Sequence, residues 1–419
     1  MPYSESSNSP KAAKAAERPS WRIVVTWLCR LIVGTAFIIG GWAKSVDPYG
    51  TLYKLLEYFA AWGMHDIPHE PVVMGAVALG ALEFTIGACV ITGVLRHSSA
   101  IAATVVMCFM LPLTAYIAIA DPVSDCGCFG DLIILDNTTT FLKNVVLAYA
   151  CVWLLRRNAS CGSPFHASVQ WAVVASSVIY ALALAAVGYN VQPVADFRPY
   201  PLGTSMYADA GDDITLIYEK DGTRREFAVD ELPDSTWTYI SPAGSAAEDA
   251  GPGFPVFGED GEETDIFEAE GDLLVFVVPD PGEHFLTRSR FANDLADYAA
   301  IHGATAVAIV GTSTAGLQEW KLLAAPHFEA YTAEDTDLKT LVRGDMGAVY
   351  LRDGIIQWKR NLASLDADLT ECAPENTNAL ENISRPDDGR LATAMTLAYL
   401  GVLALLALGS FVIGVRRRK

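Results

Sequence analysis

Cys126 and Cys128 are separated by a single glycine, in a short polar segment between two apolar segments that are each long enough to cross a bilayer. Two thiols at a membrane surface can carry out thiol–disulfide exchange or bind a soft metal ion. The disulfide ring of a Cys-x-Cys pair is small and strained, which makes it more oxidising than a structural disulfide. This spacing favours a donor of oxidising equivalents that a quinone or another protein reoxidises. A static crosslink, or two thiols that only fill the loop, is the alternative. No nearby His or Cys completes a zinc site, so we expect no metal.

Glu83 lies about a dozen residues into the second apolar segment, near the bilayer centre, where an ionised carboxylate is costly unless it is paired or protonated. Two interpretations stay open: a proton carrier beside a quinone or a reacting thiol, or a hydrogen-bonded strut between helices. The candidate partners of Glu83 are Lys44, Tyr116, Lys143 and Asn144. The last three are also the candidate lining of a quinone pocket.

Six apolar segments are predicted to span a membrane, since a spanning helix needs about 20 mostly apolar residues. They cover residues 24–43, 71–94, 98–120, 140–155, 169–189 and 392–415. Clusters of Lys and Arg precede the first segment and follow the second, fourth and sixth, so all four clusters fall on one side. The positive-inside rule makes that side the cytoplasm. Both termini are then predicted to be cytoplasmic, and the Cys-Gly-Cys faces the oxidising compartment.

Cys372 is a third thiol on the predicted outer side, shortly before the last span. We consider it a candidate for exchange or pairing with Cys126 or Cys128, and an unpaired thiol is the alternative. The cysteines inside the spans are expected to be small apolar fillers: Cys29, Cys89, Cys108 and Cys151.

Residues 190–390 have the composition of a soluble, acidic block, with 38 acidic and 14 basic side chains and a net charge of −24. That charge argues against nucleic-acid binding. Strands at 214–218 and 225–229 flank a turn and predict a β-hairpin. From residue 272 the pattern β-α-β-α-β-β predicts a thioredoxin-like domain.

The first four spans resemble the DoxX/MauE group of bacterial four-helix membrane proteins over residues 22–157. The resemblance rests on DPYGTLYKLLEYFAAWG (47–63), itself predicted to be an amphipathic surface helix, and on DCGCFGD (125–131). The chain is similar to the long form of that group, in which a fifth span, an Asp196–Tyr200 segment and a thioredoxin-like domain follow. The resemblance implies envelope redox work: maturation of a disulfide-rich methylamine dehydrogenase subunit for MauE, and electron transfer to quinone for DoxX.

A redox-active thioredoxin has Cys-x-x-Cys after its first core strand and a cis-proline before its hairpin. Here residues 278–284 contain no cysteine, and Met346 stands where the proline would be. We therefore expect this domain to dock partners and not to run a dithiol cycle.

We expect an α-helical membrane bundle, made of a four-helix DoxX/MauE unit and two further spans, with an inserted α/β thioredoxin-like extracytoplasmic domain. The expected divisions are a disordered N-terminus (1–21), the four-helix unit (22–157), the fifth span (169–189), a linker with the hairpin (190–270), the thioredoxin-like domain (271–390), the sixth span (392–415) and a basic tail (416–419).

The expected function is a thiol–disulfide oxidoreductase or disulfide-relay factor of the bacterial inner membrane. The alternatives are a non-catalytic envelope scaffold with a structural disulfide, and an accessory subunit of a quinone-linked oxidoreductase. Expected partners are the lipid bilayer and an envelope client or a soluble thioredoxin-like protein, and a quinone is the one cofactor considered.

Overall fold

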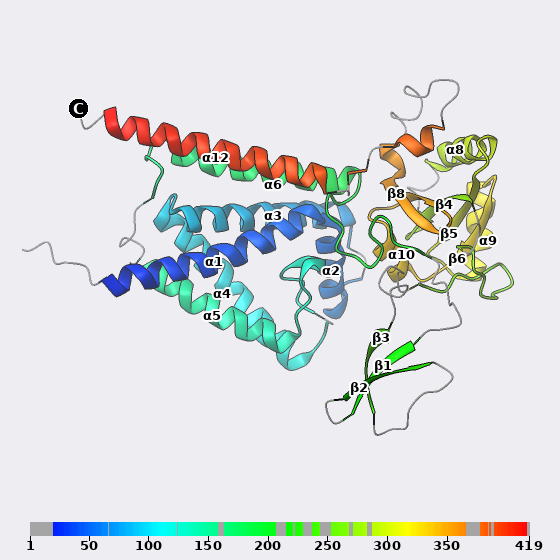
Figure 1. The fold of residues 1–419 in the computed structure, drawn as a ribbon, viewed down its shortest axis with the longest axis horizontal. Coiled ribbons are helices and arrows are strands. Elements are labelled where there is room, and N and C mark those ends of the chain that lie inside the picture. Colours follow the sequence, from blue (N-terminus) through cyan, green and yellow to red (C-terminus); the bar gives the residue numbers. More distant parts are fainter. Residues whose placement is uncertain are drawn as a thin grey trace, which may run out of the picture.

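The computed structural model describes residues 20–65, 67–123, 125–157, 163–206, 215–220, 223–228, 237–243, 253–267, 271–282, 287–365, 378–383, 385–386 and 389–416. They form a bundle of long helices, an α/β domain at one end of the bundle, and a small separate sheet (Figure 1). The predicted fold class, a membrane helical bundle with an inserted α/β domain, is confirmed.

Among the described residues, six helices are long and apolar enough to cross a membrane, and they coincide with the six predicted spans. They are α1 (Ser20–Val46), α3 (His69–Thr92), α4 (Arg96–Ala120), α5 (Asn137–Arg157), α6 (Gln170–Asn190) and α12 (Arg390–Arg416). The predicted amphipathic helix is α2 (Pro48–Ala61), and the carboxylate of Asp47 caps it by accepting from the N–H of Gly50. The protein is therefore a multi-pass membrane protein in contact with lipid.

Helices α1 and α3 approach closely because glycines lie along their contact. A Cβ at Gly41 would lie 2.1 Å from the backbone nitrogen of Phe84, and a Cβ at Gly87 would lie 2.6 Å from that of Ile38. Small residues let helices pack tightly in a membrane, where lipid gives little hydrophobic drive for association.

Helices α6 and α12 form an antiparallel pair beside α3. The rings of Tyr180 and Tyr399 stack with centroids 4.7 Å apart, and Phe84 of α3 packs against both rings. Hydroxyl hydrogen bonds join Ser177 to Tyr399 and Tyr180 to Thr396. Only 11% of the apolar stretch of α12 is buried, so most of this helix faces lipid.

The α/β domain is built on a five-stranded sheet of order β6-β5-β4-β7-β8. Its strands are β4 (Asp272–Val278), β5 (Thr305–Val310), β6 (Glu329–Thr332), β7 (Gly347–Arg352) and β8 (Ile355–Asn361). The first three are parallel, β7 runs antiparallel to β4, and β8 runs antiparallel to β7. The predicted thioredoxin-like order is thus confirmed, whereas β6 was not predicted.

Three helices cover the two faces of this sheet. Helices α8 (Ser289–Ile301) and α9 (Thr314–Ala324) pack on one face, and α10 (Asp335–Leu341), which was not predicted, packs on the other. Strand β4 is buried on both faces, which explains its continuous apolar sequence.

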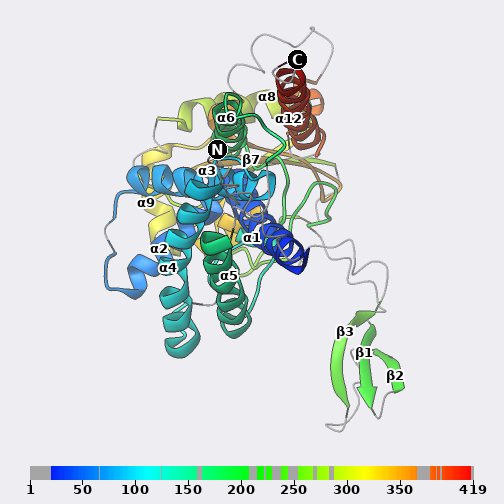
Figure 2. The ribbon, with the colours of Figure 1, turned by 90° about the vertical axis from the view of Figure 1, so that its left-hand side faces the viewer.

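A three-stranded antiparallel sheet lies apart from both (Figure 2). It consists of β1 (Thr215–Lys220), β2 (Thr223–Ala228) and β3 (Thr238–Ala243) in the order β2-β1-β3. Strands β1 and β2 confirm the predicted hairpin, and β3 was not predicted.

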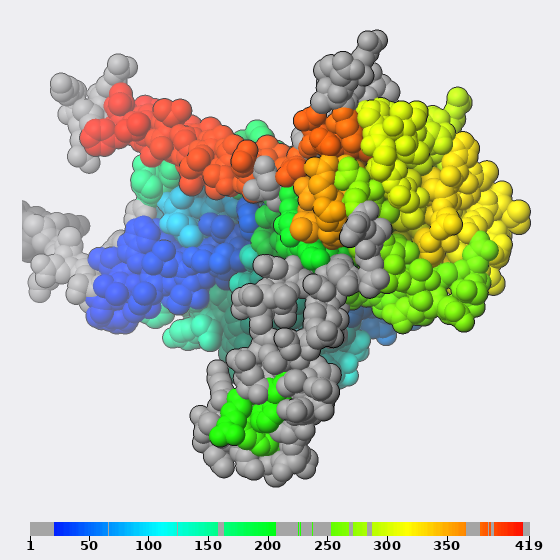
Figure 3. All heavy atoms as spheres, turned by 45° about the vertical axis from the view of Figure 1, so that its right-hand side comes forward, coloured from blue at the N-terminus to red at the C-terminus, as the bar shows by residue number. Residues whose placement is uncertain are grey.

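The α/β domain lies directly against one end of the bundle (Figure 3). The segment after α6 is fixed to the domain by a buried ion cluster. The carboxylate of Asp196 accepts hydrogen bonds from Arg198, at 2.6 Å, and from the fully buried Lys359 of β8.

Candidate functional site

The Cys-Gly-Cys loop lies between α4 and α5, at the end of the bundle that faces the α/β domain (Figure 1). The sulfurs of Cys126 and Cys128 are 2.9 Å apart, as free thiols. Cys126 is buried, with 7% of its surface exposed, and Cys128 is partly exposed. A small movement would bring the two sulfurs to the ~2.05 Å of a disulfide bond. The two principal predicted site residues are therefore adjacent and able to react with each other.

Glycine is required between the two cysteines. Gly127 has a φ of +65°, and a Cβ there would lie 2.7 Å from the Cγ of Lys54 on α2. The turn is held from within the loop as well, because the carboxylate of Asp125 accepts from the N–H of Gly127 at 2.7 Å. Any other residue would strain this turn through both its backbone and its side chain.

Two side chains of α2 bind the Cys-Gly-Cys loop, and neither was predicted from the sequence. The ammonium of Lys54 pairs with the carboxylate of Asp125 at 3.0 Å, and the hydroxyl of Tyr58 donates to the carbonyl of Cys126 at 3.0 Å. Lys54 and Tyr58 are four residues apart and so share one face of α2. The prediction of α2 rested on its apolar face alone. The four-residue spacing of Lys54 and Tyr58 is the sequence signal that could have identified them.

Lys44 of α1 and Glu83 of α3 support the loop from inside the helical bundle. The Nζ of Lys44 lies 2.7 Å from the Oε2 of Glu83, and both side chains are buried. The same ammonium donates to the carbonyl of Cys128 at 2.5 Å. Of the four candidate partners of Glu83, Lys44 is the one that it contacts here. The intramembrane carboxylate is therefore linked, through one lysine, to the backbone of the reactive loop.

The pKa values of the two thiols are shifted in opposite directions. The pKa of Cys128 is lowered, because the thiol of Cys126 donates a hydrogen bond to its sulfur and Lys143 and Lys44 lie nearby. The same hydrogen bond, together with burial, raises the pKa of Cys126. The ammonium of Lys143 lies 4.1 Å from the ring centroid of Phe129, beside the loop. Cys128 is thus the thiol that ionises first.

Two cavities adjoin the thiols. A largely apolar cavity of about 260 Å³ is lined by both cysteines, by Lys44 and Glu83, and by side chains of α2 and α4 that include Phe109 and Leu113. A smaller cavity, of about 40 Å³, is lined by Cys128, Lys143 and Asn144. The smaller one has room for about one water molecule.

The three residues predicted to line a quinone pocket do not meet in one cavity. Lys143 and Asn144 line the small cavity, and the amide of Asn144 also donates to the hydroxyl of Thr114 at 3.3 Å. Tyr116 is 45% exposed on α4 and does not line either cavity. A group the size of a quinone ring would fit only the larger cavity.

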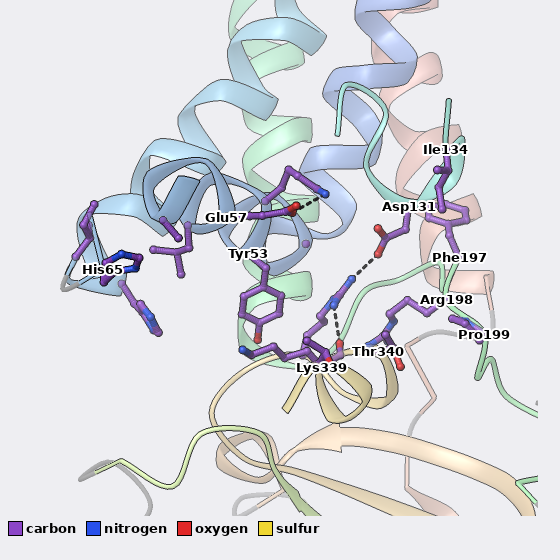
Figure 4. Close-up of a pocket in the computed structure, with 18 of the residues that line it drawn as sticks. Tyr53, Glu57, His65, Asp131, Ile134, Phe197, Arg198, Pro199, Lys339 and Thr340 are labelled. Atoms are coloured by element: carbon purple, nitrogen blue, oxygen red, sulfur yellow. Dashed lines mark hydrogen bonds and ion pairs between the residues drawn. The ribbon is translucent and has the colours of Figure 1, made fainter. Parts of the chain in front are cut away.

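An open cleft of about 850 Å³ separates α2 from the α/β domain (Figure 4). Tyr53 and Glu57 line it on the α2 side, and Lys339 and Thr340 line it on the side of α10. Gly50, Lys54 and Asp131 line both this cleft and the apolar cavity. The cleft and the apolar cavity that the cysteines line are therefore separated only by these shared lining residues.

Cys372 lies outside the described residues, so its predicted exchange with Cys126 or Cys128 stays a prediction. Within the described part of the chain, no group of three or more His, Cys, Asp and Glu side chains could hold a metal ion.

Residues 22–157 match the family model described as methylamine utilisation protein MauE. Residues 213–242, which include most of the small sheet, match a model described only as a domain of unknown function. No curated protein matches the chain.

Part of the chain is similar to solved structures from Xanthomonas campestris. One, whose title concerns the alkyl peroxide reduction activity of bacterioferritin comigratory protein, is 18% identical, with 27% of this chain and 90% of that one covered and a TM-score of 0.22. Two cysteine-to-serine variants of peroxiredoxin Q also give 18% identity and a TM-score of 0.22, over 27% of this chain and 90% or 89% of theirs. At this TM-score the likeness carries no argument about function.

Proposed function

We propose that this protein carries out thiol–disulfide exchange at the membrane surface, with Cys126 and Cys128 as the reacting pair. The reacting pair lies within residues 22–157, which match the MauE family model. One observation carries the proposal. The two sulfurs are 2.9 Å apart in a turn held by Asp125, Lys54 and Tyr58. The hydrogen bond from Cys126, together with two nearby lysines, lowers the pKa of Cys128. A crosslink that only staples a loop needs no such difference between its two thiols.

The pKa difference assigns a role to each sulfur. A thiolate of the client attacks the Sγ of Cys126, the bond between Cys126 and Cys128 breaks, and Cys128 leaves as the thiolate. A leaving thiol of lower pKa leaves faster, so Cys128 is the better leaving group. The client's second thiol then loses its proton and attacks the client sulfur of the mixed disulfide, which releases Cys126. The client loses two electrons and two protons, and the cysteine pair gains them.

Reoxidation of the pair requires a two-electron acceptor, for which we propose a membrane quinone; when bound, it would take up two electrons and two protons. The apolar cavity of about 260 Å³ supports this choice, because it opens on both thiols and approaches the ~300 Å³ at which small-molecule pockets begin. Phe109 and Leu113 would hold the ring, and the Lys44–Glu83 pair would hold a proton near Cys128.

We place the loop and the α/β domain on the outer side of the cytoplasmic membrane, with both termini inside. The Lys and Arg clusters that flank the spans support this orientation. The α/β domain, without a cysteine in its described residues, is then a docking module for an envelope client or a soluble thioredoxin-like protein.

Mixed-disulfide trapping in cells tests the proposal. Cys128→Ser cannot form the Cys126–Cys128 bond, so an adduct forms by the reverse step: the Cys126 thiolate attacks the disulfide of an oxidised client, one client sulfur bonds to Cys126 and the other leaves as a thiolate. No Cys128 thiol is then present to attack Cys126 and release the client, so a client should remain covalently bound to Cys126, whereas Cys126→Ser should trap none. Cys89→Ser, which removes a buried thiol of α3, is the matched control and should behave as wild type. Identical adducts from both variants, or none together with an unchanged thiol state of envelope proteins, would contradict the proposal and favour a structural disulfide.

A further inference from the structure

We infer that Arg343 of the α/β domain is a positioning residue for the Cys-Gly-Cys loop, so that this cysteine-free domain sets the reactivity of thiols it does not contain. The inference rests on the proposed function for its meaning, but its main measurement does not require a client.

Arg343 lies just after α10 and is buried, with 4% of its surface exposed. Its Nε donates to the carboxylate of Asp47 at 2.8 Å, and its Nη2 donates to that of Asp131 at 2.5 Å. Its Nη1 donates to the carbonyl of Lys339. All three guanidinium nitrogens are therefore occupied, two of them by carboxylates of the helical bundle.

Those two carboxylates belong to the two elements that shape the thiol site. Asp47 caps α2, the helix whose Lys54 and Tyr58 hold the loop. Asp131 follows Cys128 by three residues and lies in the one-turn helix η1 (Gly130–Leu132). Arg343 thus ties the support of the loop to the loop itself, across the cleft of Figure 4.

The arginine is itself held in a fixed place. Its backbone N–H donates to the side-chain oxygen of Gln192, and its carbonyl accepts from the amide of the same side chain, at 3.2 and 3.0 Å. Gln192 is fully buried and also donates to the side chain of Asn361 on β8. A side chain with its backbone held this firmly can fix the position of the groups it binds.

Without Arg343, the carboxylates of Asp47 and Asp131 would lose the guanidinium that binds both of them. Burial raises the pKa of Asp131, which Arg343 opposes. Like charges that lose a shared buried cation move apart or take up a proton. Because η1 continues directly from the loop, movement of Asp131 would carry Cys128 away from its own charged neighbours.

The charged and titratable groups that face Cys128 come from every element packed around it. They are Cys126 in the loop, Lys44 on α1, Tyr58 on α2, Glu83 on α3 and Lys143 on α5. Displacement of the loop changes the distances to the two lysines, which favour the thiolate together with the hydrogen bond from Cys126. The pH dependence of Cys128 alkylation therefore reports the position of the loop.

The experiment compares reduced, full-length Arg343→Met with wild type in detergent. Arg343→Met should move the pH midpoint of Cys128 alkylation upward and slow exchange with a dithiol peptide at least tenfold. Arg343→Lys keeps the positive charge but cannot bind both carboxylates as the guanidinium does. Its alkylation midpoint and exchange rate should fall between those of wild type and Arg343→Met. Arg352→Met is the matched control: this arginine of β7 pairs with Asp272 and Glu381 of its own domain and should leave both measurements unchanged.

If Arg343→Met fails to fold, Asp131→Asn provides the same test, because its side chain is 41% exposed and lies at the edge of the contact. It should shift the midpoint in the same direction, and combining it with Arg343→Lys should add little. A wild-type alkylation profile in a folded variant would overturn the inference. Wild-type protein that fails to oxidise the dithiol peptide would contradict the proposed function instead, while the alkylation profiles would still decide the role of Arg343.

Discussion

The α/β domain and the helical bundle each contain part of what a redox-active thioredoxin combines in one fold. The α/β domain has the sheet and the covering helices, but Pro279–Gly282 follow its first core strand and none of its described residues is a cysteine. The bundle has the thiols, in a loop held by α2 and by Lys44. Under the proposed function, thiol reactivity in this molecule would follow from a tight turn, the hydrogen bond between the two thiols and nearby lysines, and not from the thioredoxin-like fold.

Removal of either thiol should have the largest effect and would test that separation most directly. Cys126→Ser and Cys128→Ser should each slow oxidation of a dithiol peptide by more than about 100-fold, because the two sulfurs act as a unit. The rate is measured with purified full-length protein in detergent. Cys108→Ser, which removes a cysteine exposed on α4, should keep the wild-type rate. Activity that survives loss of Cys126 or Cys128 would place the chemistry elsewhere.

Both regions contain a buried ion pair, Lys44–Glu83 in the bundle and Lys359–Asp196 at the α/β domain, and the first can be tested as a support. Glu83→Gln leaves the buried ammonium of Lys44 without its counter-charge and should lower the free energy of unfolding by about 3–5 kcal/mol. The measurement is denaturant unfolding in detergent.

The double variant Lys44→Met/Glu83→Met removes both charges and should be more stable than Glu83→Gln alone. A single variant as stable as wild type would mean that Glu83 is already neutral, which would favour its role as a hydrogen-bonded strut between helices.

The strained turn at Gly127 should have an intermediate effect. Gly127→Ala forces a side chain into a left-handed conformation and against Lys54, at a cost of about 1–3 kcal/mol, so thiol exchange should slow about tenfold or more. Gly63→Ala is the matched control, because its φ is +81° but a Cβ there would contact nothing within 4 Å. Equal slowing in both variants would mean that the effect of Gly127→Ala is not specific to the cysteine loop.

The pH dependence of the thiols should show the smallest effect. Cys128 has a lowered pKa, so its thiolate persists to lower pH than that of an ordinary cysteine near pKa 8.5. Lys143→Gln should raise that pKa, which reduces the thiolate fraction at pH 7 and slows iodoacetamide alkylation about 3- to 10-fold. Lys321→Gln, in the α/β domain, should change nothing. An unchanged rate in Lys143→Gln would mean that the hydrogen bond from Cys126 and the charge of Lys44 are enough to lower the pKa of Cys128.

Local patterns predicted most of the fold. Spans are visible because each is a long apolar run, and the buried strand β4 is visible because it is apolar throughout. Strand β6 (Glu329–Thr332) was not predicted, because it has only four residues and its two ends are polar. The hairpin of β1 and β2 was predictable from its turn, whereas β3 begins in a stretch without alternation.

The site was only partly predictable because its parts come together by tertiary packing. Cys126 and Cys128 are two residues apart in the sequence, so their proximity could be predicted without the fold. Glu83 had four candidate partners, and it pairs with Lys44 because α1 packs closely on α3, which the sequence does not show. Arg343 is 212 residues from Asp131 along the chain, and no spacing rule connects them.

The side-by-side arrangement of α6 and α12 has a consequence for how this architecture could be assembled from modules. The hydrogen bonds Ser177–Tyr399 and Tyr180–Thr396 join α6 and α12 as an antiparallel pair, so the last turn of α6 and the first turn of α12 lie at the same end. The α/β domain is therefore an insertion between two adjacent helix ends. Such an insertion can be gained or lost without breaking the helical hairpin that holds it. A shorter relative with a simple turn in its place would keep the cysteine loop and lose the arginine that steadies it.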